Sequence, residues 1–300
     1  MTGKTYPASG PVTLDVNLNN SPLSKALFDG EVKSDLVTLN FVGPKAAHEA
    51  FKPMVQERRF DVSEMAIVTF LQAKTYGKPL VLLPTVVLAR PQHHCILVNV
   101  DKGIDQPKDI EGRQIASRSY AQATAVWVRG ILQNDYGVDI NKVDWSVAGG
   151  GHLAEYSDPS ITSRLPAGSK PEELLVSGDV DGAILGADMP DEPRVKHLIA
   201  NAKAAGVEWV KKHGFTPINH LVSVDQDLHD QRPDVVVELY RMLEASRALG
   251  AADDAARQFG VEKNRKGLAT AIQYSVEQQV IPKAFDVDEL FTDLTRTFGA

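Results

Sequence analysis

Three side chains of the sequence are of types that move protons. Glu64 stands in FDVSEM, residues 60–65, where a strand-like run is expected to give way to a helix. His93 lies in RPQHH, residues 90–94, and His220 opens an apolar strand-like run. A carboxylate and an imidazole in one cleft can act as general acid and general base. Two of them also have a structural alternative, because Glu64 would complement a helix dipole and His220 would be a hydrogen-bonded structural histidine.

A second group of side chains is suited to hold an anion. Residues 112–136 predict a short strand, a polar turn with Arg118, Ser119 and Tyr120, and an amphipathic helix. The N–H groups and positive dipole end of such a helix attract small anions. Arg90 adds a cation in the stiff connection before residue 95. We therefore expect Arg90 and this turn to contact an anionic ligand.

Asn20 and Ser24 follow the first predicted strand, residues 12–18. The carboxyl ends of the strands are where open α/β sheets bind ligands, so both side chains are candidate substrate contacts. The alternative is that they only cap the next short helix.

Strand-like and helix-like segments alternate from residue 12 to about residue 224, and residues 233–300 have helical patterns. Residues 55–68 and 174–184 repeat one pattern: an apolar-faced helix, a turn with Asp-Val, and an apolar strand. This repeat favours an α/β fold with two similar lobes that face each other across a cleft.

The composition limits the possible partners. The chain has 300 residues, of which 43% are hydrophobic, and its formal net charge is −7. This length suffices for a large core, and the negative charge without basic runs disfavours a nucleic-acid partner. No window predicts a membrane span and the N-terminal segment lacks the apolar centre of a secretory signal. With one cysteine, Cys95, the sequence predicts a cytoplasmic protein.

Several catalytic motifs are missing from the sequence. It has no H-E-x-x-H, no paired Cys/His metal spacing, no G-x-S-x-G and no phosphate-cradling glycine motif. We therefore expect neither a metal site nor nucleotide binding, and we interpret Cys95 as a small core residue.

A longer set of segments resembles the 4,5-dihydroxyphthalate decarboxylase family. The segments are FDVSEM (residues 60–65), ILVNVDKGI (96–104), SYAQATAVWVRGIL (119–132), YGVD (136–139) and GFTPINHLV (214–222). The resemblance implies a type 2 periplasmic-binding-protein-like fold with a ligand cleft between two lobes and a helical C-terminal segment. It implies that residues 1–99 and 222–300 form lobe one and residues 100–221 form lobe two.

The resemblance also implies an enzyme, a cofactor-independent carboxy-lyase of aromatic compound catabolism and phthalate degradation. It carries Glu64, His93, Tyr120 and His220 into the site. His93 or Glu64 would donate a proton to the ring, and His220 would polarise a ring hydroxyl. Arg118, with Ser119 and Tyr120, would anchor the substrate.

Departures from the family pattern predict an altered substrate. Leu88, Ala89 and Gln92 replace residues that the family has as polar or basic, and Arg118 and Ser119 replace its Pro-Glu before the tyrosine. Arg90 and Arg118 would supply replacement charge for a carboxylate. The partner is then a small aromatic carboxylate, with a homo-oligomer possible. The alternative function is a solute-binding or sensing protein for a small aromatic anion, and a thiamin-precursor enzyme is disfavoured by the single cysteine.

Overall fold

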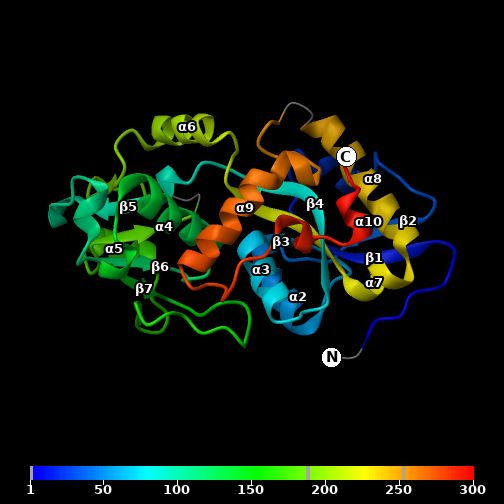
Figure 1. Ribbon diagram of the computed structural model, residues 1–300, viewed down its shortest axis with the longest axis horizontal. Coiled ribbons are helices and arrows are strands. Elements are labelled where there is room, and N and C mark those ends of the chain that lie inside the picture. The colour runs from blue at the N-terminus through cyan, green and yellow to red at the C-terminus, as the bar shows by residue number, and fades with distance from the viewer. Residues whose placement is uncertain (1–2, 187–189, 252–253) are drawn as a thin grey trace. The chain divides into compact units, whose positions relative to one another are not determined.

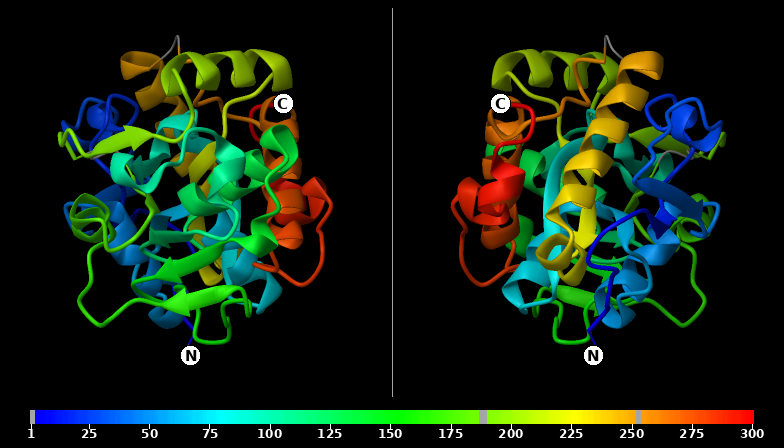
Figure 2. Two further views of the ribbon diagram at one scale, coloured as in Figure 1. Left: turned by 90° about the vertical axis from the view of Figure 1, so that its left-hand side faces the viewer. Right: turned by 90° about the vertical axis from the view of Figure 1, so that its right-hand side faces the viewer.

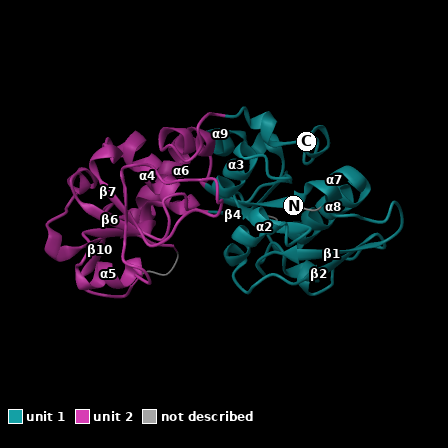
Figure 3. Ribbon diagram, turned by 90° about the horizontal axis from the view of Figure 1, so that it is seen from below, with its two compact units in different colours: residues 1–89, 218–269, 285–300 teal, residues 90–217, 270–284 magenta. Residues whose placement is uncertain are grey.

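The computed structural model describes residues 3–186, 190–251 and 254–300, and the chain divides into two compact units (Figure 3). Unit 1 consists of residues 1–89, 218–269 and 285–300. Unit 2 consists of residues 90–217 and 270–284. Each unit contains its own sheet and helices, so the predicted α/β class is confirmed.

Unit 1 is built on a five-stranded sheet in the order β2-β1-β3-β11-β4 (Figure 1). β1 is parallel to β2 and β3, whereas β11 is antiparallel to both β3 and β4. Pro84 is accommodated in β4 because that strand forms an edge of the sheet, where a missing N–H is tolerated. The strand bounds are β1 (Val12–Asn17), β2 (Val37–Phe41), β3 (Val62–Ala66), β4 (Leu80–Ala89) and β11 (Ile218–Asp225).

The core of unit 1 forms where the apolar sides of these strands meet α8. Val16 and Val222 from the sheet belong to the same buried cluster as Leu239 and Leu243 from α8. The right-hand view of Figure 2 displays this side of the molecule, with α8 in gold. The helices of unit 1 are α1 (Lys25–Phe28), η1 (Ala47–Ala50), α2 (Phe51–Glu57), α3 (Ile67–Thr75), α7 (Gln226–Gln231), α8 (Pro233–Gly250), η6 (Val287–Leu290) and α10 (Asp293–Arg296).

Unit 2 is built on a six-stranded sheet in the order β10-β5-β9-β6-β7-β8. β6 is parallel to β7 and β9, and β7 is parallel to β8, whereas β5 is antiparallel to β9 and β10. The strands are β5 (Ile96–Asn99), β6 (Gln114–Ser117), β7 (Asp144–Val147), β8 (Thr162–Arg164), β9 (Gly182–Ile184) and β10 (Val195–His197).

The longest helices of unit 2 are α4, which is buried over most of its length, and α6, which contacts η2. α6 is the yellow-green helix at the top of the left-hand view of Figure 2. The helices are η2 (His93–Cys95), η3 (Val100–Lys102), η4 (Pro107–Ile110), α4 (Ala123–Tyr136), η5 (Ile140–Lys142), α5 (Pro171–Ser177) and α6 (Ala202–His213), and α9 (Val261–Glu277) begins in unit 1 and ends in unit 2.

The unit boundaries differ from the lobes expected at residues 99 and 222. Residues 90–99 lie in unit 2 because β5 pairs with β9 and β10. Residues 218–221 lie in unit 1 because β11 pairs with β3 and β4. Residues 270–284 lie in unit 2, where Gln278 bonds to α4.

Two local expectations also differ from the structure. Ser63, Glu64 and Met65 lie inside β3, and the helix α3 begins only at Ile67. The C-terminal part is not helical throughout, because residues 254–260 contain no helix and residues 252–253 lie outside the described chain. Instead Phe259 forms a bridge with Thr85, and Gly260 donates its N–H to the carbonyl of Pro84.

Candidate functional site

Glu64 and His220 form a hydrogen-bonded pair in the sheet of unit 1. Glu64 lies opposite Val222 and His220 lies opposite Ala66 in the antiparallel β3–β11 register. The two side chains are therefore diagonal neighbours on one face of the sheet. Their Nδ1 and Oε1 atoms are 2.6 Å apart. The sequence predicts both residues, and the fold brings them together.

The environment of Glu64 favours its ionised form. The residue is only 2% exposed, and burial raises the pKa of its carboxyl. The hydrogen bond and charge of His220, followed by two N–H groups of Asn19, outweigh burial and lower the pKa below its ordinary value. A carboxylate can only accept, so Nδ1 of His220 is the donor. Nε2 of His220 is then the ring nitrogen that can exchange a proton with a ligand.

Asn19 is a contact of this pair that the sequence does not nominate. Its backbone N–H donates to Oε2 of Glu64 and its Nδ2 donates to Oε1, both at 3.0 Å. The ring of Phe51 meets the imidazole of His220 edge-on, with ring centroids 5.1 Å apart. The sequence nominates the adjacent Asn20 by its place after β1, but no sequence pattern distinguishes which asparagine bonds to Glu64.

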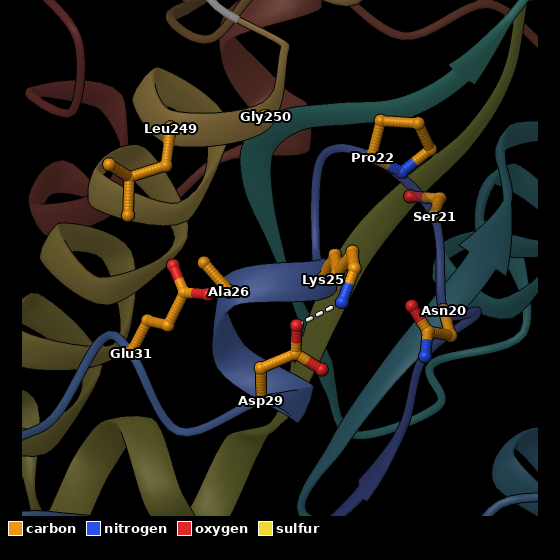
Figure 4. A pocket seen from close by; sticks show the side chains of 9 residues that line it. All are labelled: Asn20, Ser21, Pro22, Lys25, Ala26, Asp29, Glu31, Leu249 and Gly250. Atoms are coloured by element: carbon orange, nitrogen blue, oxygen red, sulfur yellow. Dashed lines mark hydrogen bonds and ion pairs between the residues drawn. The ribbon is translucent and has the colours of Figure 1, made fainter.

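Asn20 follows Asn19 directly, and Ser24 lies in the same turn after β1. Oγ of Ser24 donates to the carbonyl of Asn19 and accepts from the N–H of Ser21, so Ser24 stabilises the turn after β1. Asn20 lines a pocket of about 490 Å³ that also contains the ion pair of Lys25 with Asp29 (Figure 4). The other lining residues are Ser21, Pro22, Ala26, Glu31, Leu249 and Gly250.

In unit 2, the turn between β6 and α4 carries Arg118, Ser119 and Tyr120. The carbonyl of Arg118 accepts the N–H of Gly149 at 2.8 Å, which ties the turn to the loop after β7. Arg118 is exposed, and Oγ of Ser119 is buried with no hydrogen-bond partner among the described residues. The first N–H groups of α4 follow this turn. The turn and the start of the helix together are therefore of the kind that binds small anions.

Tyr120 points into the interior of unit 2 and packs on Arg129. Both side chains are completely buried, and the guanidinium carbon lies 3.7 Å from the ring centroid of Tyr120. Arg129 also donates Nη2 to the carbonyl of Tyr120 at 2.5 Å and Nε to Gln278 at 2.8 Å. Burial raises the pKa of the Tyr120 phenol. Tyr120 thus fixes the start of α4 from inside.

Arg90 and His93 lie at the start of unit 2. His93 is 2% exposed and its ring lies 6.2 Å from the rings of Tyr136 and Trp209. Burial, partly offset by the charge of Asp135, lowers the pKa of His93 to about 4. His93 is therefore neutral near pH 7. The guanidinium of Arg90 reaches His94, with Nη1 3.5 Å from Nε2.

The described residues contain neither a cluster of metal ligands nor a helix able to cross a membrane. Across residues 3–186, 190–251 and 254–300, no three His, Cys, Asp or Glu side chains come together as metal ligands would. In the same described ranges, no helix combines the length and apolar character that crossing a membrane requires.

Cys95 is buried, and burial raises the pKa of its thiol to about 11. This thiol is therefore protonated at neutral pH.

The chain is similar in sequence to two curated enzymes, although no protein-family model matches it. A 4,5-dihydroxyphthalate decarboxylase of Comamonas testosteroni is 28% identical over 255 residues, which cover 79% of this chain and 75% of that enzyme. A 4,5-dihydroxyphthalate decarboxylase of Pseudomonas putida is 26% identical over 220 residues, covering 68% of this chain and 84% of that enzyme.

Solved structures identify the fold. The alkanesulfonate-binding protein SsuA of Xanthomonas axonopodis pv. citri, bound to MOPS, aligns with a TM-score of 0.57 and 13% identity over 95% of this chain and 99% of that one. The aliphatic sulphonate binding protein SsuA of Escherichia coli aligns with a TM-score of 0.52 and 12% identity over 92% and 84%. The predicted resemblance is confirmed: the chain is similar in sequence to 4,5-dihydroxyphthalate decarboxylases and has a type 2 periplasmic-binding-protein-like fold.

Proposed function

We propose that the protein is a cofactor-independent decarboxylase of a hydroxylated aromatic carboxylic acid, either 4,5-dihydroxyphthalate or an altered analogue. The observation that carries the proposal is the pair of an ionised Glu64 and the Nδ1–H of His220. The names of the two similar curated enzymes support the same reaction class. Decarboxylation needs a proton on the ring carbon, and this pair presents a histidine suited to deliver one.

His220 is the proton donor in this proposal. Nε2–H of protonated His220 gives its proton to the ring carbon that bears the carboxylate. The ring supplies the electron pair of the new C–H bond, helped by electron density from the hydroxyl oxygen. The bond from the ring to the carboxylate then breaks, its electron pair restores the aromatic ring, and carbon dioxide leaves. Solvent returns one proton to His220 for each carbon dioxide released.

Glu64 stays ionised throughout these steps. Its negative charge stabilises the imidazolium and its Oε1 holds Nδ1–H, so that Nε2 keeps one orientation. The sequence offered His93 or Glu64 as the donor. We favour His220, because a buried histidine with a pKa of about 4 and an ionised carboxylate both lack the proton to give near pH 7.

We further propose that Arg118 and Ser119 hold an anionic substituent of the substrate. Arg118 is exposed and the buried Oγ of Ser119 has no hydrogen-bond partner in the described residues. A guanidinium can form a bidentate pair with a carboxylate, which favours an acid with a second carboxylate. Substituting Arg118 by Ala is expected to raise KM for a diacid more than for a monoacid.

The test is a direct assay of carbon dioxide release. A panel of hydroxylated aromatic mono- and diacids is first screened by thermal shift, and each acid that binds is then supplied with a ¹³C-labelled carboxylate. Release of labelled carbon dioxide by the wild type, and its loss in His220→Gln, is the expected result. Binding of an acid without release would overturn the proposal and favour a solute-binding or sensing role.

A further inference from the structure

Asn19 makes four polar contacts that link Glu64 to a neighbouring segment. Its backbone N–H and its Nδ2 both donate to the Glu64 carboxylate at 3.0 Å. Its Oδ1 accepts the N–H of Ala47 at 3.0 Å, and its carbonyl accepts from Ser24. All of these atoms belong to unit 1. Asn19 therefore donates a hydrogen bond to each oxygen of the Glu64 carboxylate, one from its backbone and one from its side chain.

The orientation of the Asn19 amide is determined by its neighbours. The N–H of Ala47 requires an acceptor, and the Glu64 carboxylate requires a donor. Only one of the two amide orientations places Oδ1 toward Ala47 and Nδ2 toward Glu64. Reversing the amide would break both hydrogen bonds, so the side chain has a single stable position.

The segment held by Asn19 also contacts His220. Ala47 is completely buried, and its carbonyl accepts Nδ2 of Asn17 at 3.1 Å. The two asparagines thus fix both backbone groups of Ala47. From Ala47 the chain continues through η1 into α2, whose first residue, Phe51, packs edge-on against the imidazole of His220. Asn19 therefore acts on both members of the pair, directly on Glu64 and through η1 on His220.

We propose that Asn19 is a positioning residue for the Glu64–His220 pair. It holds the carboxylate so that Oε1 points at Nδ1 of His220, and this fixes the imidazole tautomer that leaves Nε2 toward the substrate. The proposal rests on the proposed function for its catalytic consequence, but the positioning itself can be measured without turnover.

The variants are Asn19→Ala, which removes both side-chain hydrogen bonds, and Asn19→Asp, which keeps the size and replaces the donor Nδ2 with an oxygen. Asn40→Ala is the matched control. Asn40 also bonds to a carboxylate through Nδ2, at 2.8 Å to Asp15, but at an exposed position of strand β2. The readouts are the ¹³C titration of the Glu64 carboxyl, the ¹⁵N shifts that report the His220 tautomer, and kcat with KM on an acid that is turned over.

In both Asn19 variants we expect the Glu64 pKa to move upward and the Nδ1–H tautomer of His220 to lose population. A hydrogen bond to a charged group is strong enough that we expect kcat to fall roughly tenfold or more, with KM little changed. Asn40→Ala should leave all readouts as in the wild type. If Glu64 titration and the His220 tautomer are unchanged in a folded Asn19 variant, the positioning role is overturned.

The outcomes separate the two proposals. If no acid releases carbon dioxide but the carboxyl titration and tautomer shift, the decarboxylase proposal fails and the positioning role stands. If Asn19→Ala does not fold, the positioning role is tested with Asn19→Asp alone, because aspartate preserves the volume of the side chain and the contact to the N–H of Ala47. Loss of stability with an unchanged tautomer and an unchanged pH profile would assign Asn19 a purely structural role.

Discussion

Nδ1 of His220 and Oε1 of Glu64 lie 2.6 Å apart, joined by a hydrogen bond between diagonal neighbours of two antiparallel strands. The residues are 156 positions apart in the sequence. Because the bond depends on the register of β3 against β11, the sheet itself sets the geometry of the pair. Rigid strands are better suited than loops to hold such a pair in one arrangement.

The first prediction concerns the activity of this pair. Glu64→Gln keeps the shape of the side chain but removes the charge that balances the imidazolium, and His220→Gln removes the proton donor. Each variant is expected to lower kcat by roughly 10²- to 10⁴-fold, the range typical of general acid–base groups. Glu49→Gln, which changes an exposed glutamate in η1, is the matched control. Steady-state carbon dioxide release is the measurement, and full activity in either site variant would refute the assignment.

The second prediction concerns the pH dependence of stability caused by His93. Its pKa is lowered from 6.5 to about 4 in the folded state, so between these values the unfolded chain binds more protons than the folded chain. The stabilisation from neutral His93 is therefore complete above pH 6.5 and is lost as the pH falls toward 4. The charge of Asp135 raises the pKa of His93, and the charges of His94 and His213 lower it further.

The measurement is urea unfolding of the wild type and of His93→Gln at several pH values from 7 to 4. The loss attributable to His93 is about 3 kcal/mol by linkage. The variant is expected to be less stable at pH 7 and to lose less stability on acidification than the wild type. Parallel curves for the two proteins would show that His93 titrates normally in the fold.

The third prediction concerns Arg129. Its guanidinium is completely buried and donates to the carbonyl of Tyr120 and to Gln278. Arg129→Met keeps an apolar side chain of similar length but leaves two buried acceptors without donors, at a cost of about 2–5 kcal/mol. Arg194→Met removes an exposed ion pair with Asp101 and should change stability by less than about 1 kcal/mol. Chemical denaturation compares the two, and equal effects would contradict the buried role.

The sequence predicted the elements of this fold better than the environment of its side chains. The alternation of apolar and polar residues predicts strands, but the segment around Glu64 is buried throughout and does not alternate. The sequence therefore predicts the end of β3 too early. Glu64 and His220 could be chosen as chemical types. Asn19 could not, because its contacts with Glu64 and Ala47 span 45 and 28 positions and depend on how β1 packs beside β3. The sequence also predicts that Tyr120 follows the strand β6, but the inward direction of its side chain depends on Arg129 from the next helix.

The last prediction concerns Gly130, which lies in the middle of α4 where the helix meets α9. A Cβ atom at this position would lie 2.0 Å from Cδ2 of Tyr274. Replacing an interior helical glycine by alanine normally stabilises a helix by about 0.5–1 kcal/mol. Here the clash is expected to dominate, so Gly130→Ala should destabilise the protein by about 1–3 kcal/mol, the usual cost of overpacking.

Gly149→Ala is the matched control, because its Cβ would meet only the carbonyl of Arg118 at 3.6 Å. Thermal and chemical denaturation measure both variants. If the clash causes the destabilisation, the double variant Gly130→Ala with Tyr274→Leu should recover most of the lost stability. Stabilisation of the protein by Gly130→Ala alone would show instead that the side chain of Tyr274 can move away at little energetic cost.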